Sequence, residues 1–397
     1  MKLKTLAFAL AAGFAAAASA QGTGPIRIGM ITDMSSLYAD IDGPAGAEMA
    51  KWAVEDFGGK VLNRPIEVLS ADHQNKPDIA SSKAREWMDK EGLTMLLGGT
   101  NSGTALAMAK VAEEKKRPFI AIGPGSARLT NEACSPYTVH YAYDTVALAK
   151  VAGTALVKAG YKTWFFLTAD YAFGHSLEAD AAAVVKANGG TVLGSVRHPL
   201  NASDFSSFLL QAQSSKAQIL ALANAGGDFT NAMKAAKEFG ITKTMKVAGL
   251  LVFINDVHSL GLANTEGLQL AGSWYWNQDD ASRKFGNRFF AKYKRMPSSL
   301  QAADYSATMN YLKAVKAAGT TDGDKVMSTL KSMKIDDFYN KGHIRADGRM
   351  IHDMYLYEVK SAKESTSPWD YYKTVATIPG DQAFTSPADS KCALLKK

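Results

Sequence analysis

The feature that most restricts the fold of this chain is a repeated alternation of short apolar segments with segments of helical spacing. The segments IRIGMI, PIEVLSA, TMLLGG and FIAIG are typical of strands. Between the first two, Ala50, Ala53, Val54 and Phe57 recur at the spacing of one helix face, and Asp78 is a suitable N-cap for a helix at 78–90. A further helix is expected at 102–115. This order predicts a parallel sheet covered by helices on both faces.

The same alternation stops near residue 140 and then begins again. Helical segments are expected at 145–159, 175–188, 203–215 and 228–239, and strand-like segments at 162–168, 191–197, 217–222 and 245–250. A chain of 397 residues with 47% hydrophobic content can form two such cores. The sequence therefore predicts an α/β protein with two doubly wound parallel-sheet lobes. In sheets of this kind ligands bind at the carboxyl ends of the strands, which places a binding crevice between the lobes.

The N-terminus has the parts of a cleaved signal peptide at residues 1–20. Lys2 and Lys4 precede the apolar stretch TLAFALAAGFAAAA, and the small residues Ala18–Ala20 stand before Gln21. The apolar stretch is shorter than a bilayer-spanning helix, and no cysteine follows it for lipid attachment. We predict export to the periplasm as a soluble protein whose net charge is near 7 − 2 = +5.

Export bears on whether the two cysteines, Cys134 and Cys392, form a disulfide. An oxidising compartment allows them to form a disulfide, which would tie down a C-terminal tail that otherwise has little reason to be ordered. The alternative is two independent thiols.

Motifs for catalysis, cofactors and metals are incomplete throughout the chain. GGTNSGTA from Gly98 has the glycine spacing of a phosphate loop but lacks its lysine, and Gly174–Glu178 departs from a nucleophile elbow at its last position. No two of the seven histidines stand four residues apart, and the positive charges are scattered. We therefore expect no enzyme, no cofactor, no metal and no nucleic-acid partner, and a hydrolase acting in the crevice is the less favoured alternative.

Small hydrogen-bond donors follow two strands of the first unit. Asn101, Ser102 and Thr104 stand at the start of a helix, and Gly125 and Ser126 follow the next strand. Helix N-termini present free N–H groups and partial positive charge, which suits a carboxylate ligand. Ser102 could also simply cap its helix, and capping uses the same geometry.

Aromatic residues follow a strand of the second unit, where a polar turn is usual. Tyr171 and Phe173 come directly after the apolar strand at 162–168. They are expected at the crevice, where they would contact an aromatic or apolar ligand; the alternative is that they cap the core of their own lobe.

The chain resembles the periplasmic substrate-binding proteins of ABC transporters, in the branch typified by leucine/isoleucine/valine-binding proteins. The resemblance rests on the order and spacing of five stretches: IRIGMITDMSSLYADIDG, GGTNSGTALAMAKVAEEKKRPFIAIG, LTADYAFGHSLEAD, DYSATMNYLKAVKAAG and IRADGRMIHDMYLYEVK. It implies lobes joined by three hinge crossovers near 139–144, 272–276 and 345–352. The N-terminal lobe would comprise 24–140 plus 276–348, and the C-terminal lobe 141–275 plus 349–390. The two lobes would close on a small ligand and deliver it to a membrane permease.

The resemblance also implies roles for individual residues. Ser102 with its neighbours, and Gly125 with Ser126, match the loops that bind the ligand's carboxylate, and Tyr171 matches an aromatic residue of the site. Members that bind amino acids place an acidic residue where this chain has the apolar run 251–253, with Asp256 further on. This departure disfavours an amino-acid ligand, because an unpaired ammonium would cost several kcal/mol to bury.

We therefore expect a small organic carboxylate, preferably aromatic, as the ligand of a monomeric binding protein. Three alternatives stay open: an apolar amino acid if Asp256 reaches the crevice, a neutral amide, and a sensory subunit that docks on a receptor. The expected ligand-binding residues are Tyr38, Asn101, Ser102, Thr104, Gly125, Ser126, Tyr171, Phe173, Asn224, Phe253 and Trp276.

Overall fold

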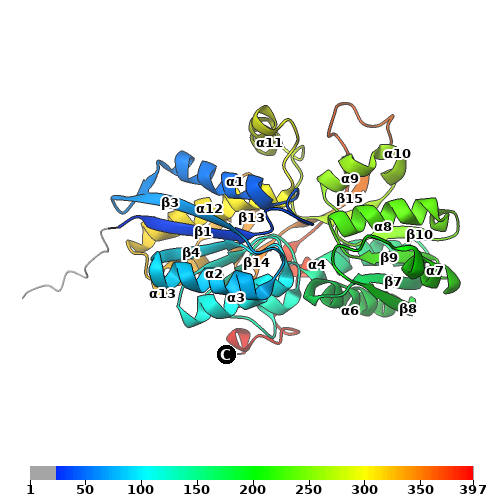
Figure 1. The fold of residues 1–397 in the computed structure, drawn as a ribbon, viewed down its shortest axis with the longest axis horizontal. Coiled ribbons are helices and arrows are strands. Elements are labelled where there is room, and N and C mark those ends of the chain that lie inside the picture. Colours follow the sequence, from blue (N-terminus) through cyan, green and yellow to red (C-terminus); the bar gives the residue numbers. More distant parts are fainter. Residues whose placement is uncertain (1–23, 397) are drawn as a thin grey trace, which may run out of the picture.

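The computed structural model describes residues 24–396 and has two lobes lying end to end, each built on its own sheet (Figure 1). The predicted signal peptide, residues 1–20, lies outside the described residues. Among the residues described, we find no helix with the length and apolar character needed to cross a bilayer.

The N-terminal lobe has a six-stranded sheet in the order β2-β3-β1-β4-β5-β6. Its strands are β1 (Ile26–Thr32), β2 (Lys60–Val61), β3 (Arg64–Asp72), β4 (Leu93–Gly98), β5 (Phe119–Ala121) and β6 (Thr138–His140). All neighbours pair in parallel except β2 and β3, which form an antiparallel hairpin. Strand β4 is buried along its whole length because helices cover both faces of the sheet, as its apolar sequence predicts.

Helices α1 (Gly43–Phe57), α2 (Pro77–Lys90) and α3 (Ser102–Glu114) connect these strands, and α11 (Asp280–Tyr293), α12 (Ser299–Ala318) and α13 (Gly323–Ser332) join the lobe later in the chain. Helix α12 packs against α1. The expected N-cap Asp78 is instead in the first turn of α2, because Pro77 starts the helix and Lys76 precedes it.

The C-terminal lobe has a parallel sheet in the order β10-β9-β7-β8. Its strands are β7 (Thr163–Ala169), β8 (Thr191–His198), β9 (Ile219–Ala223) and β10 (Lys246–Gly249). The helices are α4 (Thr145–Leu148), α5 (Thr154–Lys158), α6 (Ala172–Ala187), α7 (Ser206–Ser214), α8 (Gly227–Glu238), α9 (Ile254–Leu260) and α10 (Leu262–Thr265). The helix expected at 145–159 is interrupted by a π-helical turn at 149–153, which separates α4 from α5.

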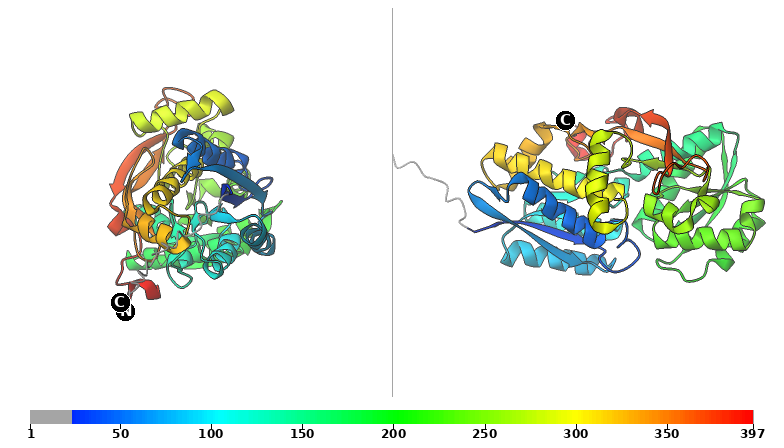
Figure 2. Two further views of the ribbon diagram at one scale, coloured as in Figure 1. Left: turned by 90° about the vertical axis from the view of Figure 1, so that its left-hand side faces the viewer. Right: turned by 90° about the horizontal axis from the view of Figure 1, so that it is seen from above.

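Two small antiparallel sheets complete the lobes where the chain crosses between them. Strands β12 (Lys334–Asp336), β13 (Lys341–Ile344) and β14 (Met350–His352) form one, and β11 (Gln269–Gly272), β15 (Met354–Val359) and β16 (Tyr372–Ile378) form the other. Figure 2 shows β15 and β16, in orange and red, beside the green lobe. The chain crosses after β6, after β11 and between β14 and β15. The predicted class, two doubly wound lobes joined by three crossovers, is confirmed.

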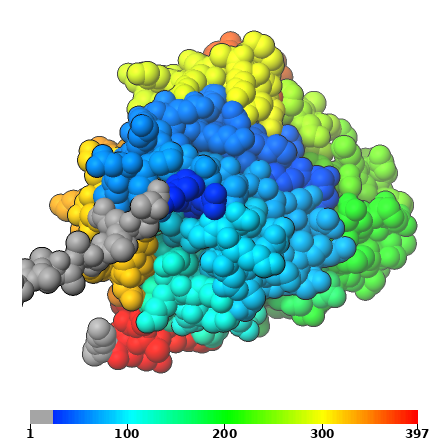
Figure 3. Space-filling view, turned by 60° about the vertical axis from the view of Figure 1, so that its left-hand side comes forward, coloured from blue at the N-terminus to red at the C-terminus, as the bar shows by residue number. Residues whose placement is uncertain are grey.

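The predicted disulfide between Cys134 and Cys392 is also confirmed, with 5.7 Å between the two Cα atoms. After β16 the chain forms the short helix α14 (Gly380–Ala383) and returns to the N-terminal lobe, where Lys391 bonds to Asn131 and Glu132. Figure 3 shows this red segment against the cyan surface of that lobe.

We predict that removing the disulfide releases the tail. In the Cys134→Ser/Cys392→Ser double variant, trypsin should cleave after the exposed Lys391 about tenfold faster or more, because the tail then opens locally without a covalent constraint. Cleavage after the exposed Lys363, in the loop between β15 and β16, is the internal control and should not change. Equal rates at Lys391 in both proteins would contradict the prediction.

Candidate functional site

The crevice between the lobes lies at the carboxyl ends of both main sheets. The residues that line it come from the loops after β1, β4 and β5 on one side, from those after β7, β9 and β10 on the other, and from the first crossover. They are Tyr38, Ile41, Thr100, Gly123, Gly125, Tyr143, Tyr171, Phe173, Ala225, Leu251 and Phe253. The walls are therefore aromatic and apolar with a few hydroxyl groups.

Tyr38 and Tyr171 meet across the crevice. Their hydroxyl oxygens are 2.7 Å apart, so one donates a hydrogen bond to the other. Burial raises the pKa of both hydroxyls above its ordinary value, and both stay protonated at neutral pH. Phe173 lies beside Tyr171, with 5.9 Å between ring centroids, and its ring packs directly on Gly125 of the opposite lobe.

Further hydrogen bonds hold the lobes together around this pair. Asn255 donates to the side chain and backbone of Asp40, and the hydroxyls of Ser126 and Ser176 are 2.8 Å apart. The space left among the lining residues holds no more than about one water molecule. The structure is thus a closed arrangement, and a ring-sized ligand needs the lobes to separate before it can enter.

The polar residues at the start of α3 mainly bond to one another. Asn101 is the N-cap: its side chain accepts from the N–H groups of Gly103 and Thr104, and the Thr104 hydroxyl donates to the Asn101 carbonyl. The alternative that Ser102 caps this helix is therefore wrong. The Ser102 oxygen instead accepts from the N–H groups of Gly125 and Ser126, 3.1 Å away in each case, and so joins the two loops.

The other expected residues occupy different places. Asn224 is buried and bonds to His198, and it does not line the crevice. Trp276 donates to the carbonyl of Trp369 and lines a separate small cavity behind Phe253. Of the eleven expected residues, Tyr38, Gly125, Tyr171, Phe173 and Phe253 line the crevice itself.

Six lining residues were not expected: Ile41, Thr100, Gly123, Tyr143, Ala225 and Leu251. Thr100 and Ala225 follow the ends of β4 and β9, so the strand-end rule that singled out Tyr171 could have found them. Tyr143 is the exception, since it belongs to the first crossover. Its hydroxyl donates to the carbonyl of Gly123, which fixes its ring at the base of the crevice.

Asp256 does not reach the crevice. Its side chain accepts from the N–H of Phe253, at the start of its own helix, and it is 4% exposed. Burial raises the pKa of Asp256 to about 8, so this carboxyl is mostly protonated at neutral pH. An amino-acid ligand is an alternative only if Asp256 reaches the crevice. The closed structure does not meet this condition.

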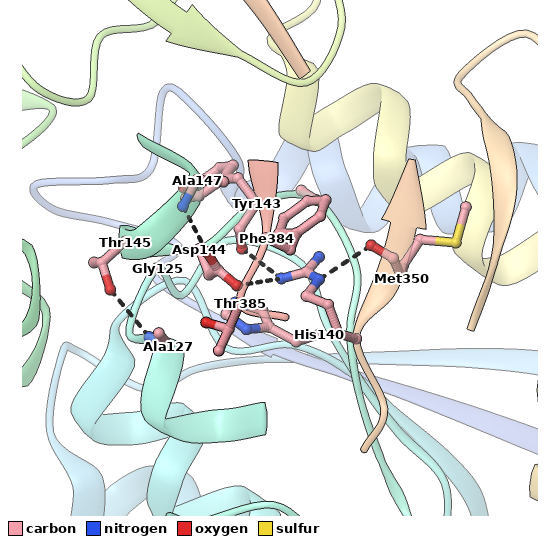
Figure 4. Close-up of polar contacts among 12 residues, drawn as sticks. Gly125, Ala127, His140, Tyr143, Asp144, Thr145, Ala147, Met350, Phe384 and Thr385 are labelled. Atoms are coloured by element: carbon pink, nitrogen blue, oxygen red, sulfur yellow. Dashed lines mark hydrogen bonds and ion pairs between the residues drawn. The ribbon is translucent and has the colours of Figure 1, made fainter. Parts of the chain in front are cut away.

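A buried arginine joins the crossovers below the crevice. The guanidinium of Arg349 donates to the carbonyls of Tyr143 and Met350 and lies 3.7 Å from Asp144 (Figure 4). The ring of Phe384 packs against this guanidinium, whose central carbon lies 4.5 Å from the centroid of the ring. The start of β14, the strand that leads into the third crossover, is thus tied to the first crossover at the point where Tyr143 enters the site.

A sequence profile described as "Periplasmic binding protein" matches residues 25–364. The chain belongs to the periplasmic binding protein family. Among solved structures, this binding protein is similar to a periplasmic binding protein from Burkholderia mallei, with 71% identity, a TM-score of 0.93, and coverage of 94% of this chain and 100% of that one. The predicted resemblance is confirmed.

Two further structures cover the same length. A branched-chain amino acid ABC transporter periplasmic ligand-binding protein from Burkholderia xenovorans LB400 is 41% identical, with a TM-score of 0.82 and coverage of 93% of this chain and 100% of that one. A solute-binding protein of an ABC transporter from Rhodopseudomonas palustris BisB5, in complex with 3,4-dihydroxy benzoic acid, is 23% identical, with a TM-score of 0.81 and coverage of 90% and 98%. The binding protein therefore has the fold and the family of ABC-transporter solute receptors, which bind small molecules.

We predict that Tyr38→Phe shifts the binding protein toward an open form. The change removes the inter-lobe hydroxyl bond, worth about 0.5–1.5 kcal/mol, which alters the open-to-closed ratio by about 2- to 10-fold. Small-angle X-ray scattering of the ligand-free protein should show a larger radius of gyration. Tyr355→Phe on β15, away from the crevice, is the control and should leave it unchanged. Identical scattering from Tyr38→Phe and wild type would contradict the role of this bond.

We also predict a pH effect of Asp256 on folding. The pKa of this carboxyl is about 8 in the folded protein and near 3.9 in an unfolded chain, so between these values only the folded state holds the proton. The contribution of Asp256 to the free energy of unfolding therefore falls by about 1.4 kcal/mol per pH unit as the pH rises from 4 to 8.

Denaturant titrations at pH 5, 6 and 7 check this effect. Asp256→Asn, which can still accept from the N–H of Phe253, should show a flatter dependence than wild type. Asp381→Asn changes an exposed carboxylate and is the control. The same slope in wild type and Asp256→Asn would rule the effect out.

Proposed function

We propose that this periplasmic binding protein captures a small aromatic carboxylate between its lobes and delivers it to a membrane permease of an ABC transporter. The observation that carries the proposal is the character of the crevice: the described residues that line it are aromatic, apolar or hydroxylic, and none of them carries a charge. Such a surface stabilises an aromatic ring and offers no carboxylate to pair with an ammonium group.

The ring would lie among Tyr171, Phe173 and Phe253 after the lobes have opened and closed again. Burying about 150–250 Å2 of surface on an aromatic ring contributes roughly 4–6 kcal/mol to binding before the costs of ordering and lobe closure are subtracted. This contribution alone gives weak binding, so the carboxylate must add to it.

The carboxylate would bind at the loops that Ser102 joins. The N–H groups of Gly125 and Ser126 already point at one oxygen, that of Ser102, and a ligand carboxylate at this place would share these donors. Each charge-assisted hydrogen bond contributes about 1.5–3 kcal/mol. Together with the ring, two or three such bonds bring the dissociation constant to the micromolar range or below.

A branched-chain amino acid is the second candidate, because the Burkholderia xenovorans relative at 41% identity is named as a periplasmic ligand-binding protein of a branched-chain amino acid ABC transporter. It requires a partner for the α-ammonium. Asp256 would have to give up its bond to Phe253 and ionise, and both steps oppose binding.

The test is a binding screen against the purified mature protein by thermal shift, followed by calorimetry. Benzoate and cinnamate derivatives should raise the melting temperature, since a ligand at 100 times its dissociation constant adds about 2.7 kcal/mol to stability. Tyr171→Ala should weaken binding of the best acid at least about tenfold through the lost ring contact. Stabilisation by leucine or valine with no response to any aromatic acid would reject the proposed ligand class, and turnover of a stabilising compound would reject the binding role.

A further inference from the structure

Two glycines on opposite sides of the crevice each contact a residue of the other lobe. Gly125, in the loop after β5 of the N-terminal lobe, contacts the ring of Phe173, at the start of α6. Gly226, between β9 and α8 of the C-terminal lobe, contacts the backbone of Leu37, in the loop after β1. The two contacts are reciprocal, because each lobe presents one glycine and inserts one residue.

Neither glycine has room for a methyl group in the closed arrangement. A Cβ atom at Gly125 would lie 2.7 and 2.8 Å from two carbons of the Phe173 ring. A Cβ atom at Gly226 would lie 2.6 Å from the carbonyl oxygen of Leu37. Non-bonded carbon atoms pack best at about 3.5–4.0 Å, so these distances are deep inside contact. A side chain at either position would stop the lobes short of the closed arrangement.

The contact at Gly226 brings two backbones together. The N–H of Gly227 donates to the carbonyl of Leu37 across the crevice, with 3.3 Å between the two atoms. A Cβ atom at Gly226 would also lie 3.1 Å from the ring of Tyr38, the residue after Leu37. The glycine thus decides how far the Tyr38 ring can advance toward Tyr171, the partner of its hydroxyl bond.

The two glycines differ in what their own backbone requires. Gly226 has φ +58° and ψ −133°, a conformation that favours glycine even before the lobes meet. The φ of Gly125 lies outside the left-handed region, so other residues can adopt its backbone conformation. Local conformation therefore does not account for the glycine at 125, whereas the contact with Phe173 of the opposite lobe does.

We propose that Gly125 and Gly226 are positioning residues that set the depth of lobe closure. Because they accept Phe173 and Leu37 without a side chain of their own, the lobes can approach until the crevice holds no more than about one water molecule. The inference goes beyond the proposed ligand, since these contacts act on the lobes whatever small molecule the protein binds.

A reversible cross-link between the lobes tests the proposal without a ligand. The hydroxyls of Ser126 and Ser176 are 2.8 Å apart in the closed arrangement, so Ser126→Cys with Ser176→Cys brings two thiols within disulfide reach when the lobes close. In a glutathione redox buffer, the fraction of protein with this bridge reports the closed population and is counted by peptide mass mapping. The native disulfide should stay formed, because structural disulfides resist glutathione.

In this cross-linking background, Gly226→Ala should lower the effective concentration of the two thiols at least about tenfold, because the methyl group overpacks the contact with Leu37. Gly261→Ala is the matched control. Gly261 also precedes a helix of the C-terminal lobe with a positive φ, but a Cβ atom there meets open space. Equal bridging in the two variants would overturn the role of Gly226.

Gly125→Ala provides a second test that holds even if Gly226→Ala does not fold. It should lower bridging by a similar factor, and the loss should vanish when Phe173→Ala removes the ring: the double variant should bridge as much as Phe173→Ala alone. A loss that persists without the ring would show a local effect on the adjacent thiol at position 126 and would overturn the role of Gly125. If no bridge forms while both glycines are intact, the lobes do not reach this depth and the inference fails.

Discussion

The alignment of the crossovers depends on one buried charge, the guanidinium of Arg349. This side chain is 1% exposed, and it joins the start of β14, next to the third crossover, to the first crossover through Asp144 and the carbonyl of Tyr143. Burial lowers the pKa of Arg349 to about 10, so the group stays charged at neutral pH. A buried ion pair adds little net stability, but removing one partner leaves the other without compensation. The pair therefore keeps the crossovers in one register, and with it the place of the Tyr143 ring in the site.

The contacts at the mouth of the crevice are of a different kind. Tyr38 with Tyr171 and Ser126 with Ser176 form neutral hydrogen bonds, each worth about 0.5–1.5 kcal/mol net. Water replaces such bonds readily, whereas the charged pair at the hinge has no such substitute. The crossovers are thus fixed in one register, and the lobes are weakly held at the mouth of the crevice. A ligand that contacts both lobes can then shift the population between open and closed forms with a modest binding energy.

The sequence predicted what depends on local pattern. Alternating strands and helices gave the two lobes, and the position of Tyr171 and Phe173 after a strand placed them at the crevice. Hydrogen bonds between side chains could not be predicted in this way. Asn101 rather than Ser102 caps α3. Both residue types are suitable caps, so the sequence alone cannot tell which of the two has the backbone geometry of the N-cap. The bond of Tyr38 with Tyr171 joins residues far apart in the chain, and the periodicity of the sequence does not predict it.

The bond between Cys134 and Cys392 closes most of the chain into a covalent ring, and all three crossovers lie inside it. A ring must be cut twice before it yields two pieces. A single proteolytic break in any exposed loop between these cysteines, on either lobe, therefore leaves both lobes attached to one another. One cut in such a loop thus separates neither half of the ligand site from the other.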